Sequence, residues 1–234
     1  MRPVTPPNSV WPAKHRRAAK PRTARDSPDA PPPAKSDEGG RGSVRIIGGG
    51  WRGRRIEFPN LAGLRPTPDR VRETLYNWLQ PSIVAARCLD LFAGSGALGL
   101  EALSRGAATV VFVEQAQAAA RTLVRELARL GGTARSRVLE MGAARFLKSP
   151  AAGVGGVFDV IFMDPPFGLD ALSQYIPLVD AGGWVKTGGV VYLENEKSAG
   201  VPALPAHWEL LKSKSAGEVG YHLARVNARV EIGC

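Results

Sequence analysis

The residues with the clearest chemical potential are Asp164-Pro165-Pro166-Phe167, which directly follow a run of apolar residues. The Asp164 carboxylate and the Pro165 carbonyl both accept hydrogen bonds, and two successive prolines fix the direction of that carbonyl. Such a pair can bind both N–H bonds of an exocyclic base amine and drive its nitrogen towards a tetrahedral, nucleophilic state. Phe167 can stack on a splayed base. A strand stop would need only one proline, so this motif predicts chemistry on a base amine.

A glycine-rich turn forms the second constellation, within 90-DLFAGSGALGLEAL-103. Its glycines let the backbone approach a ligand closely, and the following helix start offers N–H groups to it. The turn suits nucleotides, dinucleotides or S-adenosylmethionine, and it lacks the Gly-Lys-Ser/Thr of a P-loop. Glu114 ends the next apolar run, where a carboxylate can accept hydrogen bonds from ribose hydroxyls. Alone, Glu114 would equally fit a charge at a helix start; with the turn, it predicts ribose binding.

Alternating strands and helices must position these residues. Strands are expected at 88–92, 109–114, 137–140, 159–163 and 189–195, and helices at 97–106, 116–130, near 146–147 and at 169–181. This order predicts a parallel sheet covered on both faces, closed by an antiparallel pair within 207–226. Because carboxyl ends of parallel strands form the ligand crevice, the glycine turn, Glu114 and Asp164 should converge on one edge.

The chain divides into three expected parts. Residues 1–43 are proline-rich, lack apolar periodicity and are predicted to be a disordered basic tail. Its cluster 14-KHRRAAKPR-22 fits an RNA-binding arm or a solvated extension. Residues 44–80 should form a hairpin, with strands near 46–47 and 51–56, and a helix over 68–79 with Thr67 as N-cap. Residues 81–234 make up the core.

Charge and composition narrow the class of protein. The formal net charge of +10 favours a polyanionic partner such as nucleic acid, although a generally basic proteome or a sticky tail would also explain it. No apolar run approaches a membrane span or a signal peptide, so we expect a cytoplasmic protein without membrane contact. Two cysteines and three histidines without ligand spacing predict neither a disulfide framework nor a metal site. The predicted phosphate-binding rim, which a solvated basic face would also explain, comprises Arg52, Arg54, Arg55, Arg65 and Arg72.

Several segments together resemble the bacterial RsmD-type guanine-N2 methyltransferases of small-subunit ribosomal RNA. They are 45-RIIGGGWRGRRI-56, 64-LRPTPDRVRETLYNWL-79, 89-LDLFAGSGALGLEALSRGA-107, 163-MDPPF-167 and 217-GEVGYHL-223. The resemblance covers about residues 44–226, and the arginine-rich segment 64–79 is its most family-specific part. It implies an α/β, class I methyltransferase Rossmann-like fold: a mostly parallel seven-stranded sheet with an antiparallel C-terminal strand, helices on both faces and a small N-terminal β-hairpin.

The resemblance also implies an activity. It points to S-adenosylmethionine-dependent methylation of a guanine N2 amine in 16S ribosomal RNA, by a monomer acting on an assembled or assembling small subunit. The catalytic residues it implies are Asp164, Pro165, Pro166 and Phe167, and the cofactor-binding residues are Asp90, Phe92, Ala93, Gly94, Ser95, Gly96, Glu114, Gly142, Ala143 and Arg70. Relatives commonly carry Asn or Asp where Gly142 stands, so the Ala143 N–H is expected to contact the adenine instead.

Two other functions remain open from the sequence. A DNA or RNA adenine-N6 or cytosine-N4 methyltransferase would use the same motif, because it serves any exocyclic amine. The lack of an extra recognition region argues against a DNA enzyme. A non-catalytic, RNA-binding ribosome-assembly factor is the third reading. Intact Asp164, Gly94 and Gly96 argue against it, and Gly142 argues for it.

Overall fold

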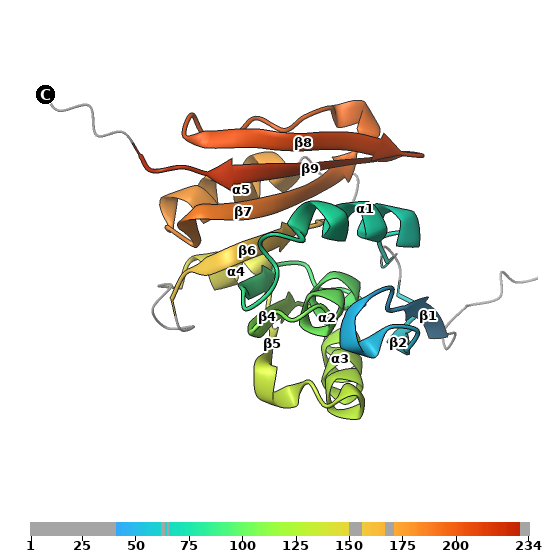
Figure 1. Ribbon diagram of the computed structural model, residues 1–234. Helices are drawn as coiled ribbons and strands as arrows, with labels where there is room; N and C mark the ends of the chain where they lie inside the picture. The colour runs from blue at the N-terminus through green and yellow to red at the C-terminus, as the bar shows by residue number, and fades with distance from the viewer. Residues whose placement is uncertain (1–40, 62–63, 65, 150–155, 167–170, 230–234) are drawn as a thin grey trace, which may run out of the picture. The chain divides into compact units, whose positions relative to one another are not determined.

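The computed structural model describes residues 41–61, 64, 66–149, 156–166 and 171–229 of the 234-residue chain. Its centre is a seven-stranded sheet in the order β5-β4-β3-β6-β7-β9-β8 (Figure 1). The pairs from β5 to β7 are parallel, and β9 runs antiparallel to both of its neighbours. The predicted fold class is therefore confirmed. The strands are β3 (Arg87–Asp90), β4 (Thr109–Glu114), β5 (Ser136–Glu140), β6 (Phe158–Met163), β7 (Val185–Glu196), β8 (Trp208–Ala216) and β9 (Val219–Val226).

Helices cover both faces of this sheet. They are α1 (Asp69–Leu79), α2 (Ala97–Ser104), α3 (Gln117–Leu130), α4 (Ala143–Leu147) and α5 (Ala171–Ala181). Alternate residues of β4 point to opposite faces, as strand geometry requires: Val110 and Phe112 pack with α1, α2 and α3, whereas Val111 and Val113 pack with α4 and α5. Strands buried on both faces explain why β4 reads as a continuous apolar run.

The N-terminal hairpin is present, but its strands differ from the prediction. Strands β1 (Arg41–Arg45) and β2 (Arg55–Pro59) pair antiparallel, with a short 3-10 turn, Gly49–Trp51, between them. The expected strand near 46–47 was wrong, because Ile47 and Gly48 dock on α2, and the expected strand 51–56 shares only Arg55 and Ile56 with β2. The Glu101 carboxylate accepts the N–H groups of Ile47 and Gly48, each at 2.8 Å.

The structure describes only the last residues of the predicted tail. The predicted tail ends too late, because Gly42 and Ser43 already pair with Phe58 and Glu57 of β2; its residues 1–40 lie outside the described part of the chain. In the described ranges, no helix is long and apolar enough to cross a membrane. Cys88 is a buried free thiol, as expected from its place in an apolar strand.

Candidate active site

The glycine turn lies between the carboxyl end of β3 and the start of α2. Gly94 and Gly96 have φ angles of +52° and +75°, in the left-handed region that favours glycine. A Cβ on Gly96 would come within 2.5 Å of the Leu123 side chain, so the turn must pack closely against α3 there. A Cβ on Gly94 would meet nothing nearer than 3.8 Å. These are ordinary van der Waals contacts, with the Leu64 side chain and the Phe92 backbone oxygen, so the positive φ, rather than the space, favours glycine at this position.

Glu114, at the end of β4, holds this turn directly. Its Oε2 atom accepts the Gly94 N–H at 2.7 Å, and its Oε1 atom accepts the Ala116 N–H at 2.6 Å. A carboxylate has about four acceptor positions, so each oxygen keeps a lone pair for another donor. The arrangement aligns Glu114 with the glycine turn and leaves it able to bind ribose hydroxyls.

Asp90 lies beneath the turn and braces α2. Its side chain is buried, and its Oδ2 atom accepts the Gly99 N–H at 3.0 Å. Burial raises the pKa of Asp90 to about 7, the Gly99 hydrogen bond opposes this shift, and the charges of Asp164 and Glu114 add to it. Asp90 thus supports the cofactor crevice from below, in contact with backbone.

Asp164 follows β6 at the same edge of the sheet. It is half-buried, and its Oδ2 atom accepts a hydrogen bond from the Thr67 hydroxyl at 3.1 Å. Burial raises the pKa of the Asp164 carboxyl group to about 7, and the Thr67 hydrogen bond opposes that shift. Pro165 is buried and Pro166 is exposed. Phe167 lies outside the described residues.

Thr67 has a different role from the one the sequence predicted. Helix α1 has Pro68 at its N-cap position, and no side chain caps it. The Thr67 hydroxyl instead reaches Asp164, 97 residues along the chain. Sequence reasoning missed this contact because Thr before Pro is a common helix start.

A second carboxyl group lies beside Asp164, and the sequence pattern did not identify it. Glu194 is 2% exposed, and its Oε2 atom accepts a hydrogen bond from the Tyr192 hydroxyl at 2.7 Å. Burial and then the charge of Asp164 raise the pKa of Glu194 to about 9, and the nearby hydroxyl groups of Tyr192 and Thr67 oppose the shift. The signal was available, because Glu194 is the penultimate residue of the expected strand 189–195, near its carboxyl end.

The remaining residues predicted to bind the cofactor lie in or near the segments that follow β3 and β5 and at the start of α1. Phe92 packs edge-on against Tyr175, with ring centroids 4.9 Å apart. Gly142 is the N-cap residue of α4, where a Cβ would meet only the Gln115 side chain, at 3.7 Å. The others are Ala93, Ser95 and Ala143, which are buried, and Arg70, which is exposed on the first turn of α1.

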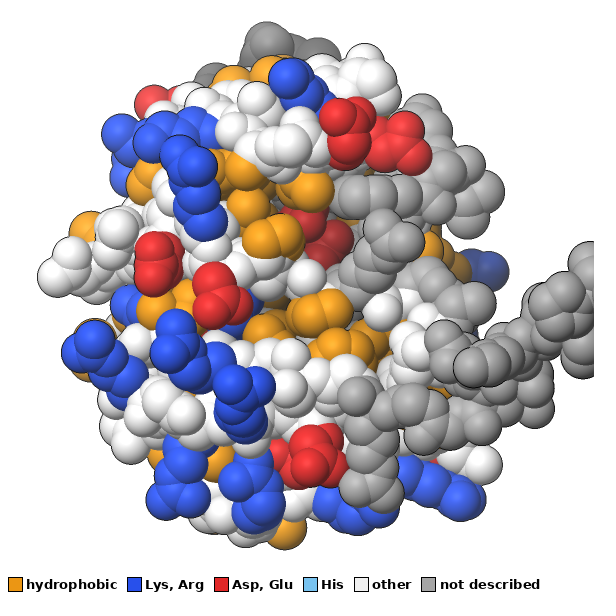
Figure 2. Space-filling model, turned by 90° about the vertical axis from the view of Figure 1, so that its right-hand side faces the viewer, with side chains coloured by type: hydrophobic (Ala, Val, Ile, Leu, Met, Phe, Trp, Pro, Cys, Tyr) orange, Lys and Arg blue, Asp and Glu red, His pale blue; other side chains and the backbone are white. Residues whose placement is uncertain are grey.

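Of the five arginines predicted to bind phosphate, three are exposed, one is buried and one lies outside the described residues. Arg52, Arg54 and Arg55 are exposed on the hairpin, and Arg65 lies outside the described residues. One face of the molecule shows Lys and Arg gathered with Asp and Glu interspersed (Figure 2).

The prediction that Arg72 binds RNA is wrong, because its side chain is fully buried. Arg72 donates to the backbone oxygens of Thr67 (3.1 Å) and Arg45 (2.8 Å) and to the Asp69 carboxylate (2.6 Å). It also lies 3.4 Å from Glu101, the buried acid that holds the hairpin loop. The positive charge of Arg72 is therefore paired with carboxylates of the protein and does not face solvent.

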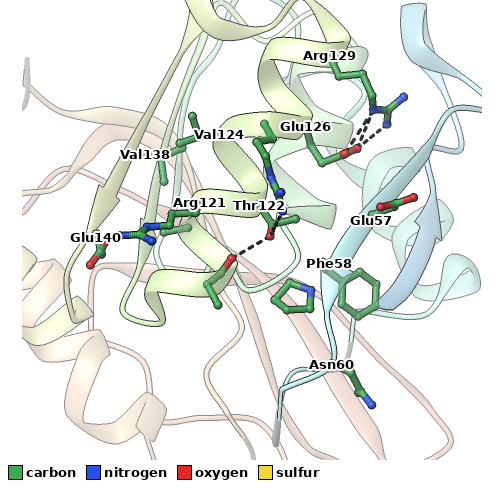
Figure 3. Close-up of a pocket in the computed structure, with 14 residues that line it drawn as sticks. Glu57, Phe58, Asn60, Arg121, Thr122, Val124, Glu126, Arg129, Val138 and Glu140 are labelled. Atoms are coloured by element: carbon green, nitrogen blue, oxygen red, sulfur yellow. Dashed lines mark hydrogen bonds and ion pairs between the residues drawn. The ribbon is translucent and has the colours of Figure 1, made fainter. Parts of the chain in front are cut away.

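A separate hollow of about 970 Å³ lies between β2, α3 and β5 (Figure 3). Both signs of charge line it. Glu126 pairs with Arg129, whose guanidinium also donates to the Arg55 backbone oxygen, and Arg125 donates to the Thr122 hydroxyl at 3.0 Å. The hollow includes neither the glycine turn nor Asp164, so it is distinct from the amine site.

Comparison with known proteins agrees with this geometry. The family model described as "Conserved hypothetical protein 95" matches residues 44–225. Relatives named ribosomal RNA small subunit methyltransferase D are 46% identical in Escherichia coli, covering 84% of this chain and 97% of the relative, and 45% identical in Haemophilus influenzae, covering 78% and 94%.

Solved structures are similar as well. A putative methyltransferase from Escherichia coli superposes with a TM-score of 0.73 at 44% identity, covering 80% of this chain and all of the other. A Thermus thermophilus 16S rRNA N2 G1207 methyltransferase, in complex with AdoMet and guanosine, shares the fold with a TM-score of 0.57. It is 24% identical, and the match covers 80% of this chain and 50% of that one.

Proposed function

This chain belongs to the family described as conserved hypothetical protein 95, which includes the ribosomal RNA small subunit methyltransferases D. From this premise, we propose that it transfers a methyl group from S-adenosylmethionine to the exocyclic N2 amine of a guanine in 16S ribosomal RNA. The observation that carries the proposal is the placement of Asp164 and Pro165 at the end of β6, at the same edge of the sheet as the glycine turn.

The crevice residues fit S-adenosylmethionine. Gly94 and Gly96 give the turn a left-handed backbone that suits close approach to a ligand, and Glu114 keeps acceptor positions for ribose hydroxyls. When bound, the cofactor supplies an electrophilic methyl group on its sulfonium. Phe92 and the backbone at Gly142 and Ala143 would border the adenine, and Arg70 would lie towards the methionine end.

Asp164 would act on the substrate amine. Its ionised carboxylate accepts one N–H bond and the Pro165 carbonyl accepts the other, which localises the lone pair on nitrogen. The nitrogen then gains the methyl group and loses one proton, which Asp164 is placed to accept. Most of the rate enhancement would come from holding amine and methyl donor in line at short distance.

The RNA is proposed to reach this site as part of the small subunit. The exposed Arg52, Arg54 and Arg55 of the hairpin are suited to contact phosphates, which position RNA without reading its sequence. We further propose that the enzyme is a cytoplasmic monomer. The relatives' names favour ribosomal RNA over the adenine-N6, cytosine-N4 and non-catalytic alternatives.

A methyl-transfer assay tests the proposal. Radiolabelled S-adenosylmethionine is offered with unmethylated small subunits, naked 16S ribosomal RNA and DNA, and the modified base is mapped. We expect label on a guanine N2 amine of ribosomal RNA, with the subunit as the preferred substrate. Label on DNA, or on adenine or cytosine, would support the runner-up enzyme. No transfer to any substrate, despite cofactor binding, would support the non-catalytic reading.

The variant Asp164→Ala tests the mechanism in the same assay. Methyl transfer should fall by at least about 100-fold, the scale of a positioned acid–base group. The dissociation constant for S-adenosylmethionine, measured by calorimetry, should change by less than about threefold, because the proposed cofactor contacts are made by other residues. Near-normal turnover of this variant would disprove the proposed role of Asp164.

A further inference from the structure

The strand register brings Asp164 and Glu194 together. Strands β6 and β7 are parallel, and Met163 is the register partner of Leu193. The next residues are Asp164 and Glu194, so two carboxyl groups follow the last paired position on adjacent strands. Parallel neighbours lie about 4.8 Å apart, so the two side chains share one side of the sheet at close range.

Hydrogen bonds join the two carboxyl groups through Thr67. Its hydroxyl donates to Asp164 at 3.1 Å and also lies within hydrogen-bonding reach of Glu194. A hydroxyl donates one hydrogen and accepts others, so it can accept from a protonated Glu194 while donating to Asp164. Tyr192, whose hydroxyl donates to Glu194, completes this cluster.

The titratable groups around Glu194 determine which of the two carboxyl groups, Asp164 or Glu194, keeps its proton as the pH rises. Asp164 faces it from β6, Tyr192 lies on its own strand, and Tyr221 is its register partner on β9. Two buried carboxyl groups this close do not both ionise readily. The charge of Asp164 raises the pKa of Glu194, which is 2% exposed, whereas Asp164 is half-buried and accepts the Thr67 hydroxyl, which opposes the rise in its own pKa. Asp164 therefore ionises first, and Glu194 keeps its proton to higher pH.

We propose that Glu194 is a positioning residue of the methyl-transfer site, whose protonated carboxyl group keeps Asp164 ionised and, through Thr67, oriented towards the substrate amine. This inference rests on the proposed function. A neutral Glu194 removes the like charge that would oppose ionisation of Asp164. Its proton also leaves the Thr67 hydroxyl free to donate to Asp164. When Glu194 ionises, the second negative charge and the lost donor both disturb Asp164.

Kinetic pH profiles of Glu194 variants test this role. For the wild-type enzyme, kcat should decline as pH rises through about 9. Glu194→Gln is neutral at every pH, so it should lose this alkaline decline and restore most of the rate that Glu194→Ala loses. We expect Glu194→Ala to lower kcat by at least about tenfold, with the KM for S-adenosylmethionine changed by less than about threefold.

Two further variants sharpen the assignment. Tyr192→Phe removes a hydrogen bond that lowers the pKa of Glu194, so the alkaline decline should move to higher pH. Glu196→Gln is the matched control, because Glu196 is exposed on the same strand two residues further on; its profile should equal that of the wild-type enzyme. An alkaline decline that is the same in Glu194→Gln and in the wild type would overturn the proposal.

An infrared difference spectrum separates this inference from the proposed function. At pH 8 the wild-type protein should show a protonated-carboxyl band that Glu194→Gln lacks, whether or not any RNA is methylated. Absence of methyl transfer with the band present would defeat the proposed function alone. Absence of the band would overturn the assignment of the proton to Glu194. Thermal melts of each variant establish that it is folded before either measurement is interpreted.

Discussion

Asp164 accepts a hydrogen bond from an amine most strongly, and can take up its proton, while its carboxyl group is ionised. Since the pKa of Asp164 is raised to about 7, kcat should fall as pH drops through about 7. Thr67→Val removes a hydrogen bond that lowers this pKa, so the acidic decline should move to higher pH. Rates with saturating cofactor and RNA, measured from pH 5.5 to 8.5, provide the check. An acidic decline near pH 4, the range of an ordinary carboxyl group, would contradict the prediction.

Gly142 offers a second test at the residue scale. Its φ of −75° suits any residue, and a Cβ would find only Gln115 at 3.7 Å. Gly142→Asn should therefore fit and add a side-chain hydrogen bond to the adenine, strengthening S-adenosylmethionine binding by about 2- to 10-fold. Gly142→Ala is the control and should leave affinity unchanged in calorimetry. Equal affinity of the Asn and Ala variants would show that no such contact forms.

Single residues differed in how far the sequence predicted them. Asp164, Glu114 and the glycines stand out because the signal is local: each ends a strand or occupies a turn. Arg72 was misassigned because its buried acidic partner, Glu101, is 29 residues away, although a second partner, Asp69, is only three residues away. Helical phase gave a warning, since Arg72 lies on the same face as the buried Tyr76 and Leu79.

Helix α1, helix α2 and the hairpin loop are joined by one buried ion pair. Glu101 of α2 accepts two loop N–H groups, and Arg72 of α1 connects that carboxylate to the Arg45 carbonyl of β1. Arg105 donates to the same carboxylate at 2.7 Å. Neither side chain of the Arg72–Glu101 pair is exposed. Loss of Arg72 would remove one of the two guanidinium groups beside the buried Glu101 carboxylate and would leave the Thr67 and Arg45 carbonyls without this donor.

We therefore expect Arg72→Ala to lower the free energy of unfolding by about 3–5 kcal/mol. Arg70→Ala, on the same helix but exposed, should change it by less than about 0.5 kcal/mol. Urea unfolding monitored by circular dichroism measures both. Equal stabilities of the two variants would mean that Arg72 contributes no more than a surface arginine.

The elements themselves were predicted with uneven success. The bounds of β4 agree with the sequence pattern, because five apolar or β-branched residues are followed by Glu114 and then by a helix start. The hairpin strands were misplaced because Ile46 and Ile47 look like strand residues locally. The backbone of Ile46 does pair within the hairpin, with Arg54 and Gly53, but the N–H groups of Ile47 and Gly48 bind the Glu101 carboxylate of α2, more than 50 residues away. Composition gives no sign of such a long-range contact.

At the scale of the whole chain, the first residues needed for the core can be located by truncation. Strand β1 begins at Arg41, and the nearby Val44 and Ile46 are 6% and 0% exposed. Removal of residues 1–40 should leave the melting temperature within about 2 °C. Removal of 1–46 exposes the partners of two buried side chains, each worth about 1.5–3 kcal/mol, and should lower it by at least about 5 °C.

Calorimetry of the three proteins provides the measurement, with methyl transfer to small subunits as a second readout. If removal of 1–40 leaves stability intact but abolishes transfer, the basic cluster at 14–22 acts as an RNA-binding arm. If it leaves both intact, that cluster is dispensable, as a solvated extension would be. A large loss of stability on removing 1–40 would show that the core begins before β1.

The sheet ends on one side at β8, whose outer edge has no partner strand among the described residues. An open edge is a template for pairing with other chains and hence for aggregation. Strand β8 carries exposed lysines, Lys212 and Lys214, and its pairing with β9 is irregular between Leu210 and Lys212. Charge and a local bulge both oppose a second strand there. The lysines and the bulge of β8 therefore oppose pairing of this edge with a strand of a second chain, and so oppose aggregation.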